Sequence, residues 1–229
     1  WKGFDKPDYL HYDANWLLIV DNLSDFSHVA FVHTNTLGGS EAYAYNTIPE
    51  TIEKMDNGFS MTRWDRGSKA APFHAKNIPE DELGDLVDRC NITEMYIPGV
   101  FLMETIFGPV GWGAEKNDRS ECREYRNCQF MTPETRNTTH FFWDYLHGFD
   151  LDNPEISKSL KESLLEGFME DKLFIEEQQK LLLESPGFVP RFIEADEAFS
   201  YFRQRWGRKL RDENEANPLA YKENKKRIL

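Results

Sequence analysis

Cysteine is scarce in this chain of 229 residues. The three cysteines are Cys90, Cys122 and Cys128, and none belongs to a Cys-x-x-Cys, Cys-x-His or Cys-x-x-His pair. The chain therefore cannot hold an iron–sulfur cluster or a structural zinc ion on its own cysteines. An odd and low number of cysteines also argues against a secreted, disulfide-bonded scaffold and favours a reducing cytoplasm.

The chain also has no long apolar run, and its basic residues are fewer than its acidic ones. Mean hydropathy is −0.65, no apolar run reaches the length of a membrane span, and no signal peptide is visible. A net charge of −13 would repel a phosphate backbone, which argues against a nucleic-acid partner. The basic clusters at 203–211 and 222–227 are interleaved with acidic or polar residues, and we interpret 206–229 as a charged, solvated tail. We expect a cytoplasmic protein that binds neither nucleic acid nor membranes.

The N-terminal two thirds of the chain shows mainly strand patterns. An extended lead-in is expected at 7–20 and a short helix at 21–33, with Asp21 or Asn22 as its N-cap and Asp25 in its first turn. Strands are predicted at 41–48, 51–55, 59–64, 89–97, 99–107, 124–132 and 137–145, with a turn at 56–58 and a long irregular excursion at 65–87.

A long helix is predicted to follow these strands. Asn153 is a natural N-cap, Pro154 occupies the favoured first helical position, and the helical pattern continues to about Leu183. A last helix is expected at 195–205. Antiparallel strands with one long helix predict an α+β domain in which the helix lies across the sheet and closes one side of a cavity.

Two histidines stand in the pattern Asp25-x-x-His28-x4-His33. Imidazole pairs on one short segment are typical of metal sites. Five residues of ideal helix advance by about 500°, which would leave the two rings about 140° apart. To bind one ion together, the helix must bulge or end between them, as helices often do at functional sites. Taken alone, the pair is equally consistent with one partly buried and one surface histidine.

An acidic residue lies on the apolar face of the predicted long helix. Leu160, Leu164 and Phe168 recur at steps of three and four residues, and Asp171 continues the same stripe. A buried carboxylate needs a partner, because burying the charge alone is costly. A metal cation is one such partner; a core Arg, a Tyr or a backbone amide is the alternative.

Together, these residues supply two imidazoles and one carboxylate. That set leaves positions open on a metal, as in non-haem Fe(II) oxygenases. A zinc hydrolase would use the same types of ligand. The third interpretation is a metal-free module that binds small molecules between helix and sheet.

Three segments resemble one known family. NWLLIVDNLSDFSHVAFVH, MTPETRNTTHFFW and FMEDKLFIEEQ are similar to the C-terminal catalytic domain of Rieske non-haem iron aromatic oxygenase α-subunits, in particular the vanillate O-demethylase group. The resemblance covers about 15–183, and its first segment is the most specific. It implies a helix-grip fold of the START and Bet v 1-like type, with all of 1–229 forming one mononuclear iron domain.

The resemblance also implies roles for individual residues. His28, His33 and Asp171 would bind Fe(II). Asp25 would hydrogen-bond His28 and link the iron site to the Rieske centre of a neighbouring subunit, unless it is only a first-turn helix charge. Asn22 would be a polar residue near the iron, or simply a helix cap.

The same resemblance places two strand residues in a substrate pocket. Met103 would face the substrate, with ordinary core packing as its alternative. Gln129 is the stronger candidate, because a polar side chain on an inner strand needs a partner. His140 is expected to be a hydrogen-bonded core histidine. Three histidines are expected to be peripheral: His11, His74 and His147.

The implied activity is that of an oxygenase component. It would use O₂ and electrons from a reductase or ferredoxin to hydroxylate or O-demethylate an aromatic compound, within a homotrimer. The electrons would pass through a Rieske [2Fe-2S] cluster on an N-terminal domain that is absent from this chain. We therefore expect the chain to be the C-terminal part of a longer protein. The sequence does not distinguish among substrates.

Overall fold

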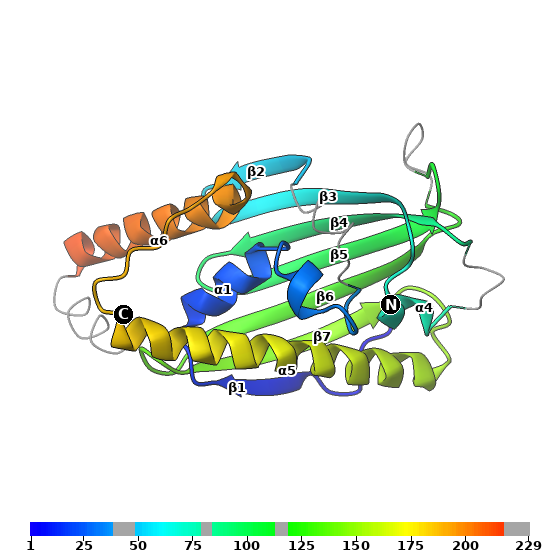
Figure 1. Ribbon diagram of the computed structural model, residues 1–229, viewed down its shortest axis with the longest axis horizontal. Coiled ribbons are helices and arrows are strands. Elements are labelled where there is room, and N and C mark those ends of the chain that lie inside the picture. Colours follow the sequence, from blue (N-terminus) through cyan, green and yellow to red (C-terminus); the bar gives the residue numbers. More distant parts are fainter. Residues whose placement is uncertain (39–48, 79–83, 113–118, 218–229) are drawn as a thin grey trace.

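A single antiparallel sheet organises the part of the chain that the computed structural model describes, which is residues 1–38, 49–78, 84–112 and 119–217. The seven strands run in the order β1-β7-β6-β5-β4-β3-β2, and the helices lie on one face of them (Figure 1). The strands are β1 Asp8–Tyr12, β2 Thr51–Met55, β3 Gly58–Ser68, β4 Val87–Tyr96, β5 Val100–Pro109, β6 Arg123–Pro133 and β7 Thr139–His147. The helices are α1 Trp16–Ser24, α2 Val29–Val32, α4 Pro72–Ala75, α5 Pro154–Glu184, η1 Glu194–Asp196 and α6 Glu197–Ala216. The α+β fold with a long helix across an antiparallel sheet is confirmed.

The central strands turn alternate side chains toward the helices. In β6, Tyr125, Asn127 and Gln129 are buried, whereas their neighbours Arg126 and Phe130 are exposed. This alternation follows from the period of two along a strand, which sends successive side chains to opposite faces. The helix-covered face therefore receives both the aromatic core and a set of polar side chains.

The long helix α5 begins and packs as its sequence predicts. Asn153 caps it by accepting a hydrogen bond from the Glu155 amide at 3.1 Å, and Pro154 is its first residue. On its buried face, Phe168 meets Trp143 of β7 edge to face, with ring centroids 4.9 Å apart. The apolar stripe therefore fixes which side of α5 turns toward the sheet.

The strand predictions at 51–55, 59–64, 89–97, 99–107, 124–132 and 137–145 are confirmed within a few residues. The turn at 56–58 joins β2 to β3 as expected. The excursion at 65–87 contains the end of β3 and the short helix α4. The strand predicted at 41–48 lies outside the described residues.

The prediction for the segment before the histidines is partly wrong, because the extended lead-in at 7–20 contains strand β1 but does not continue to residue 20. Residues from Trp16 onward form helix α1, because Asn15 acts as its N-cap and accepts a hydrogen bond from the Leu17 amide at 3.0 Å. Neither Asp21 nor Asn22 caps a helix. Asp25 is the C-cap of α1 rather than a first-turn charge, so the helix-dipole role considered for it falls away.

The last helix is longer than predicted. It continues to Ala216, so the first part of the segment interpreted as a solvated tail is helical. Phe199 and Phe202 bury its inner face, and Arg203 pairs with Asp21 of α1. Among the described residues, no helix combines the length and the apolar character needed to cross a membrane.

Candidate metal centre

The two histidines lie at opposite ends of a single helical turn. His28 precedes α2 with helical dihedral angles (φ −63°, ψ −29°), and His33 ends it with non-helical ones (φ −107°, ψ 37°). Because the helix stops there, the two rings approach to 5.3 Å between centroids, with their planes inclined by 71°. The expected interruption of the helix is therefore present.

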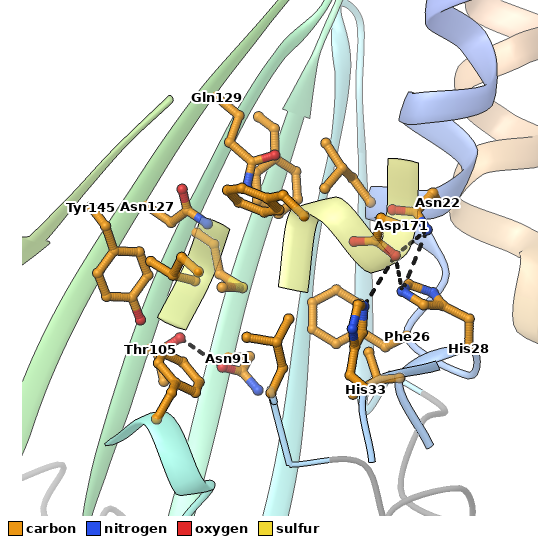
Figure 2. Close-up of a pocket in the computed structure, with 18 of the residues that line it drawn as sticks. Asn22, Phe26, His28, His33, Asn91, Thr105, Asn127, Gln129, Tyr145 and Asp171 are labelled. Atoms are coloured by element: carbon orange, nitrogen blue, oxygen red, sulfur yellow. Dashed lines mark hydrogen bonds and ion pairs between the residues drawn. The ribbon is translucent and has the colours of Figure 1, made fainter. Parts of the chain in front are cut away.

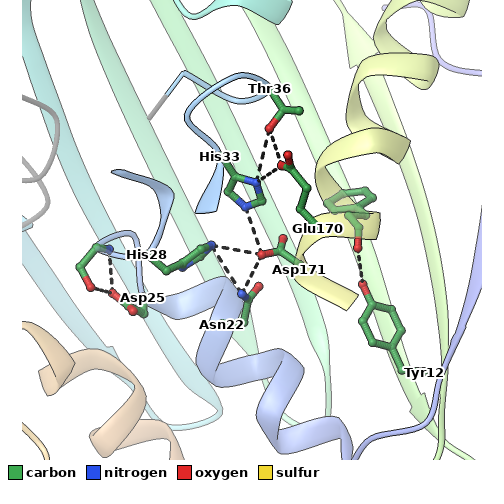
Figure 3. Close-up of polar contacts among 10 residues, drawn as sticks. Tyr12, Asn22, Asp25, His28, His33, Thr36, Glu170 and Asp171 are labelled. Carbon is green, nitrogen blue, oxygen red and sulfur yellow. Dashed lines mark hydrogen bonds and ion pairs between the residues drawn. The ribbon is translucent and has the colours of Figure 1, made fainter. Parts of the chain in front are cut away.

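Asp171 of α5 faces both rings (Figure 3). Its Oδ1 lies 3.0 Å from His33 Nε2 and 3.4 Å from His28 Nε2. One ligand atom from each of the three residues lies within 4.8 Å of the others. The structure thus brings together the three side chains predicted as ligands, from two elements far apart in the sequence.

The carboxylate at the centre of this cluster is charged. Burial raises the pKa of Asp171, but hydrogen bonds from His28 and His33 and their positive charge outweigh this effect, and the pKa falls to about 2. For His33, burial lowers the pKa, but hydrogen bonds and charge from Asp171 and Glu170 outweigh burial and raise it. Without a cation, a proton on His33, whose pKa is raised, compensates the buried carboxylate. A divalent cation offers the same compensation when it replaces this proton.

Glu170 and Thr36 lie on the Nδ1 side of His33, and neither residue was predicted from the sequence. Glu170 Oε2 accepts a hydrogen bond from His33 Nδ1 at 2.8 Å, and the Thr36 hydroxyl donates to the same oxygen at 2.6 Å. A carboxylate on Nδ1 leaves Nε2 to face the metal position and makes the imidazole a stronger ligand. The one available signal was the position of Glu170 beside Asp171.

Asn22 contacts the cluster from the last turns of α1. Its Nδ2 donates to Asp171 Oδ1 at 3.0 Å and lies 3.5 Å from His28 Nε2. The capping role considered for it is excluded, since Asn15 caps α1. Its amide instead orients the carboxylate.

Asp25 does not make the expected contact with His28. Its Oδ1 accepts hydrogen bonds from the Ser27 amide at 2.7 Å and the Ser27 hydroxyl at 2.6 Å. His28 Nδ1 is buried and has no hydrogen-bond partner among the described residues. Asp25, His28 and Asp171 all border a surface groove between α1 and α5, so Asp25 lies on the outer side of the cluster.

On its inner side, the cluster opens into a cavity of about 100 Å³ beneath the sheet (Figure 2). Both residues predicted to face a substrate, Met103 and Gln129, line this cavity. His74 also lines it and is buried, so its assignment as peripheral is wrong. Apolar side chains also line this cavity, among them Phe26 and Phe168.

The remaining histidines lie outside this cavity. His140 is hydrogen-bonded as expected, to the Tyr9 hydroxyl at 2.8 Å, but it lies part-exposed at the outer face rather than in the core. His11 is at the surface beside Glu134, as predicted. His147 is buried rather than peripheral, and its Nδ1 donates to the Phe149 carbonyl oxygen at 2.6 Å.

The fold and the cluster together define a class: a helix-over-sheet domain with two histidines and one carboxylate at one end of a cavity. Residues 12–212 match the family model described as the vanillate O-demethylase oxygenase C-terminal domain. The chain belongs to this family, which comprises catalytic domains of Rieske oxygenase α-subunits.

Individual relatives agree with this assignment. The chain is 33% identical to the toluene-4-sulfonate monooxygenase system iron-sulfur subunit of Comamonas testosteroni, over 91% of this chain and 60% of that protein. It is 26% identical to the dicamba O-demethylase oxygenase component of Stenotrophomonas maltophilia, over 83% of this chain and 54% of that protein. The crystal structure of dicamba monooxygenase bound to 3,6-dichlorosalicylic acid has the same fold, with a TM-score of 0.76 at 22% identity, covering 89% of this chain and 57% of that one. The chain thus spans less than two thirds of the length of these relatives.

Proposed function

We propose that this chain is the catalytic part of an oxygenase component that hydroxylates or O-demethylates an aromatic substrate at a mononuclear ferrous site. The observation that carries the proposal is the position of His28, His33 and Asp171. Their ligand atoms converge at one end of a cavity that apolar side chains line in part.

Ferrous iron fits this set of donors. Two imidazole nitrogens and one carboxylate oxygen are the ligands that non-haem oxygenases use, and they leave positions open on the ion. Iron bound there would supply the activation of O₂. An iron site also accounts for two imidazoles aimed at one buried carboxylate oxygen, since a shared cation satisfies all three groups.

The residues around the ligands orient them and exclude water. Glu170 and Asn22 fix the directions of His33 and Asp171 through the hydrogen bonds described above. Phe26 and Phe168 give the cavity apolar walls, which keep water from the reacting carbon. Because a cavity of about 150 Å³ accommodates benzene, side chains around this one must move apart to admit a substituted ring.

The reaction balances with O₂ and two electrons. An aryl methyl ether, O₂, two electrons and two protons would give a phenol, formaldehyde and water. Hydroxylation of a methyl group or a ring carbon would consume the same reagents and release water. The names of the relatives include both toluene-4-sulfonate monooxygenase and dicamba O-demethylase, so both outcomes are compatible with the family.

The electrons would come from outside the described residues. We propose a [2Fe-2S] Rieske cluster on a separate domain, reduced by a reductase or ferredoxin, in a cytoplasmic homotrimer. Asp25 supports this arrangement, because its carboxylate lies at the outer groove of the metal cluster, where a neighbouring subunit could reach it.

Elemental analysis and turnover of the anaerobically purified full-length protein test the proposal. We expect stoichiometric iron and, with a reductase and a panel of methoxyarenes and methylarenes, oxygen consumption coupled to formaldehyde or alcohol formation. Zinc with hydrolysis in the absence of O₂ would contradict the proposal in favour of a hydrolase. Ligand binding without any metal would contradict it in favour of a simple binding module.

A further inference from the structure

The cavity has a second polar end, formed by the sheet. Opposite the metal ligands, four strands contribute uncharged polar side chains (Figure 2). They are Asn91 of β4, Thr105 of β5, Asn127 and Gln129 of β6, and Tyr145 of β7. We call these five residues the sheet end of the cavity.

Part of the sheet end is satisfied internally. The Thr105 hydroxyl donates to Asn91 Oδ1 at 2.9 Å, and the Tyr145 hydroxyl lies 3.4 Å from His74 Nε2. The first contact follows the register of β4 with β5, in which Thr105 pairs with Asn91, and the second joins β7 to α4. They hold this polar wall rigid without help from a ligand.

Asn127 and Gln129 are different. They are 5% and 1% exposed, and neither Asn127 Oδ1 nor Gln129 Oε1 has a hydrogen-bond partner among the described residues. Buried amide groups are almost always paired in folded proteins, because an unpaired one keeps the cost of leaving water. Two neighbouring exceptions on one strand, both lining a cavity, point to a ligand that completes them.

The charge around the sheet end restricts that ligand. Arg89 is the only Lys or Arg among the described residues that line the cavity. Its guanidinium is buried and pairs with Asp65 Oδ2 at 3.1 Å. Burial, with the charge of Arg89, lowers the pKa of His74 well below its usual value, so this ring is neutral.

We propose that the sheet end binds an uncharged hydrogen-bonding substituent of the aromatic substrate, such as a carboxamide or a phenol hydroxyl, through Asn127 and Gln129. The inference rests on the proposed function for the identity of the ring that carries the substituent. It makes these two amides the residues that select the substrate class.

An ionised carboxylate or sulfonate fits the same wall poorly. It can accept hydrogen bonds from the amide NH₂ groups but offers no donor to the two amide oxygens. It would also lose its hydration without an uncompensated cation to replace it, which is costly for a buried charge. A carboxamide both donates and accepts, so it can complete both side chains at no cost in buried charge.

Binding of a matched pair of probes tests the proposal. Calorimetric titration of the full-length protein with 4-methoxybenzamide and with 4-methoxybenzoate, ionised near neutral pH, compares one shape with and without charge. We expect the benzamide to bind tighter by about tenfold or more. Equal or tighter binding of the benzoate, or no detectable binding of the benzamide, overturns the proposal.

Substitutions on β6 test whether Asn127 and Gln129 cause the preference for the benzamide. Gln129→Met and Asn127→Leu keep the side-chain size but remove the amide, and each should remove most of the preference for the benzamide. Cys128→Ser lies between them, on the other face of the strand, and should leave the preference unchanged. A preference that survives both amide substitutions overturns the assignment of these residues.

Iron content, measured on the same samples, separates this proposal from the proposed function. If the protein retains iron and consumes O₂ but prefers the benzoate, the proposed subsite is refuted and the proposed oxygenase function is not. A protein that prefers the benzamide but retains no iron refutes the oxygenase and leaves the subsite standing.

Discussion

The two ends of the cavity differ in the charge of their polar side chains and in how far these side chains are paired with one another. At the metal end, the ionisable side chains that flank α2 and lie on α5 bond to one another and to the Asn22 amide of α1, and Asp171 Oδ1 alone lies within 3.4 Å of three nitrogen atoms. At the sheet end, uncharged groups stand on four neighbouring strands, and two of them are unpaired among the described residues. Among the described residues, the polar atoms that face the cavity at the metal end are bonded to one another, and only the outward His28 Nδ1 lacks a partner, whereas the sheet end leaves two amide oxygens unpaired.

This difference suits two separate tasks: the metal end serves the reaction, and the sheet end serves the choice of substrate. A metal site must hold its ligands in place whatever substrate arrives, and hydrogen bonds behind the ligands do this. In a recognition site, the polar groups instead form hydrogen bonds with the ligand, so these groups remain unpaired until the ligand binds. We therefore expect substitutions at the metal end to remove activity altogether, and substitutions at the sheet end to redirect it.

The largest effect is expected at Asp171. Asp171→Ala removes the carboxylate ligand and leaves two imidazoles, which rarely retain Fe(II), so iron content should fall to background. Glu166→Ala is the matched control, because it removes an exposed carboxylate from the same helix. Metal analysis after anaerobic purification measures both variants.

A clear outcome would refute the ligand set. If Asp171→Ala retained stoichiometric iron while the circular dichroism spectrum of the variant stayed native, another residue would have to supply the carboxylate. His28→Ala gives an independent check, since it removes a different ligand from a different element and should also empty the site.

A smaller, separable effect is expected at Asp25. Asp25→Asn should keep its iron, because Asp25 contacts Ser27 and none of the ligands. Turnover with the reductase should nevertheless fall by about tenfold or more, if the carboxylate couples the iron site to a neighbouring subunit. Oxygen consumption and iron content, measured together, separate the two properties. Asp13→Asn, at an exposed carboxylate, is the control, and full activity of Asp25→Asn would remove the proposed role.

The sequence predicted the metal end better than the sheet end, for physical reasons. His28 and His33 stand five residues apart, and Asp171 lies on an apolar stripe whose period is visible in the sequence. Glu170 faces His33 only because α2 ends where it does, which no local pattern encodes. The start of α1 was missed because the apolar run from Trp16 fits a strand as well as a buried helix.

The sheet end depends on information that a single sequence does not carry. Gln129 was predicted from a resemblance and from the rarity of buried polar side chains on inner strands. Asn91, Thr105 and Tyr145 join it only through the registers between four strands. A shift of one residue in any of these registers would turn the side chain to the opposite face. The polar wall is therefore a property of the assembled sheet.

The smallest effect, and the sharpest test of how the metal end is supported, is expected at Glu170. Glu170→Gln keeps an oxygen that can accept from His33 Nδ1 but removes the negative charge that strengthens His33 as a ligand. Iron affinity should fall by no more than about tenfold, measured by competition with a chelator, while the melting temperature of the iron-free protein changes little. Thr36→Val leaves the carboxylate in place and removes only one donor to it, so its effect should be smaller. If both variants bound iron like the unmodified protein, the metal end would need no support behind its ligands, and the contrast between the two ends of the cavity would rest on charge alone.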